Sequence, residues 1–202
     1  MTTDSISAPS ARATVRRKAD RGRYERDTIH AILDEGLVAH VGFTSDFGVA
    51  VLPMVYARLD DDLYLHGAVG NHMLRALDDA DVCVTVTLVD GLVLSRSAFH
   101  HSMNYRSVVV YGRAELVDDD DEKDRVLRAV VDHMVDGRSR QCRPPTAEER
   151  RATRVLRFPL HEASAKVRSG PPIEEPDDLG LPYFGGVVPL SLVRGAPVAD
   201  GL

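Results

Sequence analysis

The chain has 202 residues, of which 44% are hydrophobic and 28% are charged, a composition typical of one ordinary globular domain. Acidic residues number 31 against 25 lysines and arginines, and this balance argues against a general nucleic-acid binder, which needs a basic face. No apolar run is long enough to span a membrane. Cys83 and Cys142 form no disulfide framework, so we expect a reducing, cytoplasmic location.

Residues 1–20 are rich in Ser, Ala, Thr and Arg and are predicted to form a disordered basic tail. The segment has no apolar core, so we do not expect a secretory signal. A basic arm of this kind can touch nucleic acid or an anionic membrane. The alternative that we favour is a solvated tail with neither partner.

After this tail the hydrophobic pattern predicts many short strands interrupted by single helices. Ile29, Ile32 and Leu33 have helical spacing within residues 24–35, and Gly36 is a suitable helix end. Apolar runs and period-two alternation predict strands at 37–43, 49–57, 63–65, 82–89, 92–98, 105–117 and 154–160. Further helices are predicted at about 70–79, after the acidic cluster 118–122, and at 146–152.

The connections complete the predicted architecture. Asp90-Gly91 is a strong hairpin signal between the strands on either side of it. Strands joined mostly by short turns predict a mainly β fold, an antiparallel barrel or sandwich with peripheral helices. We therefore expect three parts: the tail 1–20, one domain over 21–170, and a Pro-rich arm over 171–202 that lies over a surface of this chain or of a partner.

One strand-to-helix junction carries the strongest chemical signal. Residues 63–77 read LYLHGAVGNHMLRAL, in which two glycines separate a strand from a helix. A helix start exposes unpaired N–H groups that bind phosphate, and glycine allows a close backbone approach. Asn71, His72 and Arg75 would surround such a phosphate. The alternative is an ordinary capped helix with His and Arg on its surface.

Two other features were weighed. Tyr105, Arg106 and Ser107 form a polar, aromatic cluster at the start of the longest predicted strand, where ligands often bind; plain sheet packing with an exposed Arg106 is the alternative. The eight histidines have no metal-ligand spacing, so no metal site is expected.

Five segments, in order, resemble the flavin-binding split-barrel superfamily, and most closely its pyridoxamine 5'-phosphate oxidase-like branch, which includes nitroimidazole-reductase-type resistance proteins. They are IHAILDEGLVAHVGF (29–43), VLPMVYA (51–57), LYLHGAVGNHMLRAL (63–77), NYRSVVVYGRA (104–114) and ASAKVRSGPPIEEPDD (163–178). The resemblance implies a six-stranded antiparallel split β-barrel and an intertwined homodimer with FMN in two sites at the dimer interface. The positions that it assigns to FMN are Val51, Pro53, Val55, His66, Gly67, Asn71, His72, Arg75, Arg106, Ser107, Lys166 and Arg168.

The implied function is an FMN-dependent oxidoreductase that reduces a small organic acceptor, such as a nitroaromatic compound, with electrons from NADH or NADPH. His66 would be the catalytic proton donor or a substrate hydrogen-bond partner; a structural histidine at a strand end is the alternative. Asn71-His72 stands where vitamin B6 oxidases typically have an Arg-Lys pair, which argues against B6 oxidation. Other readings are a pyridoxamine-phosphate-oxidase-type enzyme, a deazaflavin protein, and a flavin or haem carrier without turnover.

Overall fold

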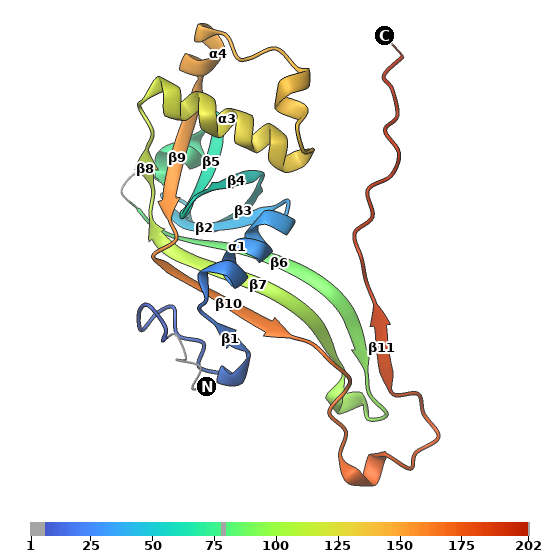
Figure 1. Ribbon diagram of the computed structural model, residues 1–202. Helices are drawn as coiled ribbons and strands as arrows, with labels where there is room; N and C mark the ends of the chain where they lie inside the picture. The colour runs from blue at the N-terminus through green and yellow to red at the C-terminus, as the bar shows by residue number, and fades with distance from the viewer. Residues whose placement is uncertain (1–6, 78–79, 202) are drawn as a thin grey trace, which may run out of the picture. The chain divides into compact units, whose positions relative to one another are not determined.

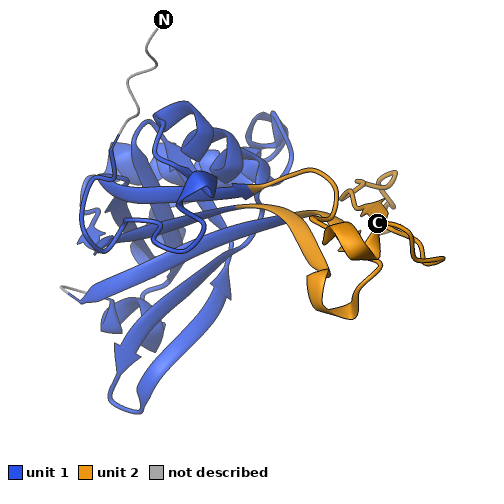
Figure 2. Ribbon diagram, turned by 90° about the horizontal axis from the view of Figure 1, so that it is seen from below, with its two compact units in different colours: residues 1–88, 107–167 blue, residues 89–106, 168–202 orange. Residues whose placement is uncertain are grey.

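The computed structural model describes residues 7–77 and 80–201 (Figure 1). The chain divides into two compact units, which Figure 2 distinguishes by colour. Unit 1 comprises residues 1–88 and 107–167, and unit 2 comprises residues 89–106 and 168–202. In the described residues, no helix is both long and apolar enough to cross a membrane.

Strands dominate the fold, and their pairings are antiparallel. Seven strands form one sheet, in the order β1-β10-β7-β6-β2-β3 with β11 paired to β6, and four strands form another, in the order β4-β5-β9-β8. The predicted mainly β antiparallel fold of split-barrel type is therefore confirmed. The strands are β1 (Gly22–Arg23), β2 (Ala39–Ser45), β3 (Gly48–Met54), β4 (Tyr56–Leu59), β5 (Asp62–Ala68), β6 (Asp81–Leu94), β7 (Ser102–Arg113), β8 (Glu115–Leu116), β9 (Thr153–Pro159), β10 (Glu162–Arg168) and β11 (Gly186–Pro189).

The α-helices lie where the sequence predicts helices, whereas the short 3-10 helices were not predicted. The α-helices are α1 (Arg26–Glu35), α2 (His72–Ala76), α3 (Asp120–Met134) and α4 (Ala147–Ala152), and the short 3-10 helices are η1 (Ala19–Arg21), η2 (Ala98–His100), η3 (Arg138–Gln141) and η4 (Pro176–Asp178). The end of the helix predicted over 70–79 falls on residues 78 and 79, which lie outside the described residues.

Two apolar clusters make up the core of unit 1. The larger one includes Ile29, Ile32 and Leu33 of α1, so the helical spacing seen in the sequence is the buried face of that helix. The smaller cluster lies between α3 and the four-stranded sheet, where Val126 and Val130 pack with residues that include Tyr64. Figure 1 shows α3 lying across β5 and β9. Burying one stripe of α3 in this way fixes the helix against the sheet.

A small network of buried and partly buried hydrogen bonds joins α1, β4 and α3. The Tyr56 hydroxyl donates to the carbonyl oxygens of Leu33 at 2.6 Å and of Gly36 at 2.9 Å. Nε2 of His133 lies 2.6 Å from the same Gly36 oxygen and donates to it, because a carbonyl only accepts. Gly36 does end α1 as predicted, but its φ of −70° is ordinary. Its lack of a side chain serves close packing instead, since a Cβ would meet Val86 at 2.4 Å.

The hairpin predicted at Asp90-Gly91 is wrong, because β6 continues unbroken through both residues to Leu94. Gly91 pairs with Pro189 of β11, and a Cβ on Gly91 would lie 3.0 Å from Val187. Close approach of a strand almost a hundred residues away, and not a turn, therefore accounts for this glycine. The N–H of Leu190 reinforces the pairing by donating to the Asp90 carbonyl at 3.0 Å.

Other boundaries also differ from the prediction. The strand expected over 49–57 is divided at Val55 into β3 and β4, and the alternating segment that forms β10 was not predicted as a strand. In the part of the predicted tail that the structure describes, residues 7–20, Ala13 is 2% exposed and Arg12 forms an ion pair with Glu162. This part thus packs on unit 1, unlike a free tail, while residues 1–6 lie outside the described residues.

Replacing Tyr56 with Phe should lower the free energy of unfolding by about 1–3 kcal/mol, because two buried carbonyl groups lose a hydroxyl donor. Urea denaturation of the two proteins measures the difference. Tyr183, whose exposed fraction is 62%, provides the matched control, and Tyr183→Phe should leave the midpoint unchanged. Equal midpoints for wild type and Tyr56→Phe would show that the Tyr56 hydrogen bonds do not contribute to stability.

Candidate functional site

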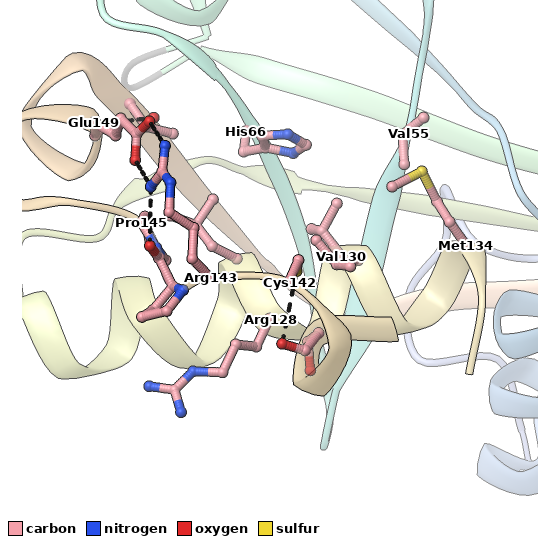
Figure 3. A pocket seen from close by; sticks show the side chains of 14 residues that line it. Val55, His66, Arg128, Val130, Met134, Cys142, Arg143, Pro145 and Glu149 are labelled. Carbon is pink, nitrogen blue, oxygen red and sulfur yellow. Dashed lines mark hydrogen bonds and ion pairs between the residues drawn. The ribbon is translucent and has the colours of Figure 1, made fainter. Parts of the chain in front are cut away.

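A cavity of about 620 Å³ lies in unit 1 against β5 and α3 (Figure 3). Its size is within the range typical of small-molecule and cofactor sites. In Figure 3, His66 occupies the middle of the site, with Arg143 and Glu149 on one side of it and Val55 and Met134 on the other. The wall is mostly apolar: α3 contributes Leu127, Val130, Val131 and Met134, and the following loop contributes Pro144 and Pro145.

The sequence of α3 explains why this wall exists. Leu127, Val130, Val131 and Met134 follow the three- and four-residue spacing of one helix face. Val130 faces both the core and the cavity, whereas Met134 lines the cavity and is 45% exposed. The apolar stripe of α3 is therefore wider than the sheet requires, and the surplus lines the cavity. Apolar surface gathered in a concave site is typical of ligand binding.

His66 is the polar group with the most unusual environment in this cavity. It lies on β5 opposite Val155 of β9, and its side chain lines the cavity. Its Nδ1 is buried and, in the part of the chain that the structure describes, has no hydrogen-bond partner. Burial also lowers the pKa of His66 below its ordinary value, so the imidazole is neutral at physiological pH. A neutral, unengaged imidazole facing an apolar cavity is suited to binding a metal centre.

The loop that closes the cavity is fastened at two points. Ser139 donates from its N–H and its hydroxyl to the Asp132 carboxylate, each at 2.7 Å. Arg143 forms two hydrogen bonds with Glu149, at 2.8 and 2.6 Å. The Arg143 guanidinium, followed by the Thr146 N–H, lowers the pKa of Glu149 to about 2. Glu149 also completes the capping box of α4, so one carboxylate ties the loop to a helix start.

Arg128, which α3 contributes to the cavity wall, has weaker polar contacts than Arg143. Arg128 lines the cavity, and its Nε donates to the Asp124 carbonyl of its own helix at 3.2 Å. Its side chain is 60% exposed, and its ion pair with the Asp124 carboxylate is long, at 4.0 Å. The Arg143 charge is thus neutralised by a short bidentate pair, whereas the Arg128 charge remains available at the cavity rim.

Most residues predicted to bind the cofactor lie outside this cavity. Val51 and Pro53 lie on β3, at the edge of its sheet, and the side chain of Val51 is 60% exposed. Val55, just beyond β3, instead lines the cavity with His66. This cavity therefore brings together two of the predicted residues, His66 and Val55.

The strand-to-helix junction has the form predicted, with part of its hydrogen-bonding capacity already used. The Asn71 side chain caps α2 by accepting from the N–H groups of Met73 and Leu74, at 3.0 and 3.4 Å. Arg75 donates to the Gly70 carbonyl at 3.1 Å, and His72 is exposed at the first position of α2. A Cβ on Gly67 would lie 2.8 Å from Leu74, so packing accounts for that glycine. The phosphate cradle stays a prediction.

The predicted basic residues have protein partners. In unit 2, Arg106 forms a bidentate pair with Asp90 at 2.9 and 2.7 Å. Arg168, 6% exposed, donates to the Asn104 side chain and to two backbone carbonyls. In unit 1, the Ser107 hydroxyl donates to the Lys166 carbonyl at 3.4 Å. Their assignment to the cofactor stays a prediction.

The sequence analysis did not predict that α3 and the loop after it form a cavity wall. The broad apolar stripe of α3, together with Pro144 and Pro145 after it, was the available signal. Among the described residues there is no group of three or more His, Cys, Asp or Glu side chains that could hold a metal ion.

The family comparison identifies the class of protein. The family model for pyridoxamine 5'-phosphate oxidase matches residues 25–167, and the chain therefore belongs to this family. No match was found among curated protein sequences.

Solved structures extend the similarity to nearly the whole chain. Flavocytochrome Anf3 from Azotobacter vinelandii is 39% identical with a TM-score of 0.92, over 97% of this chain and 92% of that one. An FAD and haem binding protein from Mycobacterium smegmatis is 33% identical with a TM-score of 0.85, over 90% and 89% of the two chains. A candidate 5-nitroimidazole antibiotic resistance protein from Bacteroides thetaiotaomicron, 23% identical with a TM-score of 0.61 over 72% and 86%, shares the fold.

The lowered pKa of His66 predicts how the ligand-free protein responds to acid. The unfolded chain takes up this proton at a higher pH than the folded chain, so the free energy of unfolding falls as pH drops below about 6.5. His66→Gln should show a smaller fall between about pH 7.5 and 5.5 in urea denaturation. His30, whose pKa burial also lowers, is present in both proteins, so their difference isolates His66. An identical fall in both would refute the prediction.

Proposed function

We propose that this chain is a flavin- and haem-binding redox protein and that the cavity beside His66 holds the haem. The observation that carries this proposal is that His66 lines a mostly apolar cavity of about 620 Å³, while its buried Nδ1 has no hydrogen-bond partner among the described residues. Two relatives that match at least 90% of this chain support it, since one is named a flavocytochrome and the other an FAD and haem binding protein.

The donor set of the cavity fits haem better than a free metal ion. A protein site for an isolated ion needs three or four side-chain ligands, and no such group is found among the described residues. Haem supplies its own equatorial nitrogens and requires only an axial ligand from the chain. A single neutral imidazole, His66, meets that requirement.

The rest of the wall suits the remainder of a haem molecule. The apolar side chains of α3 and the two prolines would cover the porphyrin faces and exclude water. The guanidinium of Arg128 at the rim would pair with the anionic carboxylates at the porphyrin edge. Haem would supply one-electron chemistry in this site, while the chain binds and orients it and sets its electronic properties.

The flavin belongs to a different part of the chain in this proposal. The edge strand β3 carries exposed apolar residues. The exposed fractions are 84% for Val49, 60% for Val51 and 41% for Leu52. We propose that the isoalloxazine ring of the flavin lies along this strand and that the phosphate of the flavin lies at the start of α2. A second copy of the chain would complete the site in a homodimer. FMN is the flavin that the family resemblance predicts, whereas the mycobacterial relative is named for FAD.

Haem then replaces the small organic acceptor as the partner of the flavin. His66 would act as an iron ligand and not as a proton donor to a nitroaromatic substrate. A bound flavin would supply two-electron and one-electron redox chemistry, and His66 would hold the haem beside it.

Haem binding is tested by reconstituting the purified protein and titrating the Soret absorbance. His66→Ala should weaken haem binding by about 100-fold or more and leave flavin content unchanged, because the axial ligand is lost. His161, which is exposed at the turn after β9, supplies the control, and His161→Ala should bind haem normally. The proposal fails if the wild-type protein takes up no haem, or if His66→Ala retains wild-type affinity.

Flavin binding is tested at the α2 junction. Arg75→Ala should weaken the flavin by about 1.5–3 kcal/mol, since a charge-assisted bond to the phosphate is removed. Fluorescence titration of the flavin-free protein measures this loss, and Arg125→Ala, on the exposed side of α3, is the matched control. Unchanged affinity in Arg75→Ala would remove this residue from the site. Chromatography of flavin released from the native protein distinguishes FMN from FAD.

A further inference from the structure

We infer that His66 binds the haem iron through Nε2 and that its Nδ1–H has no hydrogen-bond acceptor, which leaves the iron with a weakly donating axial ligand. This inference rests on the proposed function, and it concerns an electronic property that haem binding alone does not imply. It predicts a reduction potential that is high, and an iron–imidazole bond that is weak, relative to a site in which the axial histidine donates to a carboxylate.

The accessibility of the two ring nitrogens determines which of them can reach the iron. The His66 side chain lines the cavity and is only partly buried. Its Nδ1, however, is sealed from solvent. An imidazole has two ring nitrogens, and a nitrogen that faces an open cavity must be accessible. Since Nδ1 is inaccessible, Nε2, at the far end of the ring, is the nitrogen left to bind the iron.

The second step follows from proton accounting. Coordination uses the lone pair of Nε2, so the single proton of the neutral ring must sit on Nδ1. In the described part of the chain that nitrogen forms no hydrogen bond. The carboxylate that lines this cavity, Glu149, is already engaged by Arg143 and by the N–H of Thr146. Among the residues that the structure describes, the cavity lining thus offers His66 no free carboxylate.

The third step is the effect on the iron. An axial histidine usually donates its second N–H to a carboxylate or a backbone carbonyl, which makes the ring a stronger donor. A stronger donor stabilises ferric iron more than ferrous iron and lowers the reduction potential. An axial imidazole without this bond should therefore favour ferrous iron and be more easily displaced.

The experiment replaces the axial ligand with two isomers of equal size. Full-length His66→Gly is reconstituted with haem in the presence of either 4-methylimidazole, which keeps the N–H, or 1-methylimidazole, which lacks it. Because the N–H of the native ring bonds to nothing, both complexes should show the same midpoint potential and the same ferrous iron–nitrogen stretching frequency. Both values should match those of the wild-type protein.

Each other outcome has a defined meaning. A lower potential and a higher stretching frequency with 4-methylimidazole than with 1-methylimidazole would reveal an acceptor for the N–H and overturn this inference alone. Haem binding to His66→Gly at wild-type affinity without added azole would overturn the proposed function and the inference with it.

The wild-type protein gives an independent answer if His66→Gly does not fold. Its ferrous iron–nitrogen stretching frequency is compared with those of free haem bound to 4-methylimidazole and of free haem bound to the deprotonated ligand. We expect a match to the neutral ligand. A frequency shifted toward the deprotonated ligand would contradict the inference, since it would indicate a hydrogen-bonded, anionic ring.

Discussion

The carbonyl oxygen of Gly36 receives hydrogen bonds from both Tyr56 and His133, and the rest of the candidate site depends on this shared acceptor. Tyr56 belongs to β4 and His133 to the last turn of α3, so one backbone atom ties a helix end, a strand and a second helix together. The Tyr56 hydroxyl and the Gly36 carbonyl are buried and His133 is partly buried, so an unpaired partner would be costly. The bond fixes the C-terminal end of α3, the end from which Met134 and the loop that closes the cavity continue.

With its end fixed, α3 serves two surfaces. Val126 and Val130 cover the four-stranded sheet, and Leu127, Val131 and Met134 turn toward the cavity. The loop after α3 cannot collapse into this space, because the Asp132–Ser139 and Arg143–Glu149 contacts hold it at both ends. An apolar cavity whose loop is held by hydrogen bonds and an ion pair is a pre-formed site. A ligand that binds there loses less free energy to ordering of the loop.

Local patterns predicted the elements well, and long-range contacts account for what they missed. The spacing of Ile29, Ile32 and Leu33 predicted α1, because a buried helix face leaves a periodic record in the sequence. The hairpin prediction at Asp90-Gly91 failed because the same dipeptide occurs both in tight turns and in strands that another strand approaches closely. The partner of Gly91, Pro189, is remote in sequence. A functional role for His66 was predicted from the sequence, but the cavity that it lines was not, because the opposite wall comes from residues 127–149, more than sixty positions away.

The alternation of β5 relates the two proposed cofactor sites to each other. Successive side chains of a strand point to opposite faces. Tyr64 belongs to the cluster beneath α3 and His66 lines the cavity, so this face of β5 is directed toward α3. Leu63 and Leu65 belong to the other cluster, and a side chain on Gly67 would strike Leu74 of α2. The face of β5 that carries His66 therefore opposes the face that supports the α2 junction. A single strand thus stands between the proposed haem cavity and the proposed flavin phosphate site, so residues of one short segment, 63–77, border both.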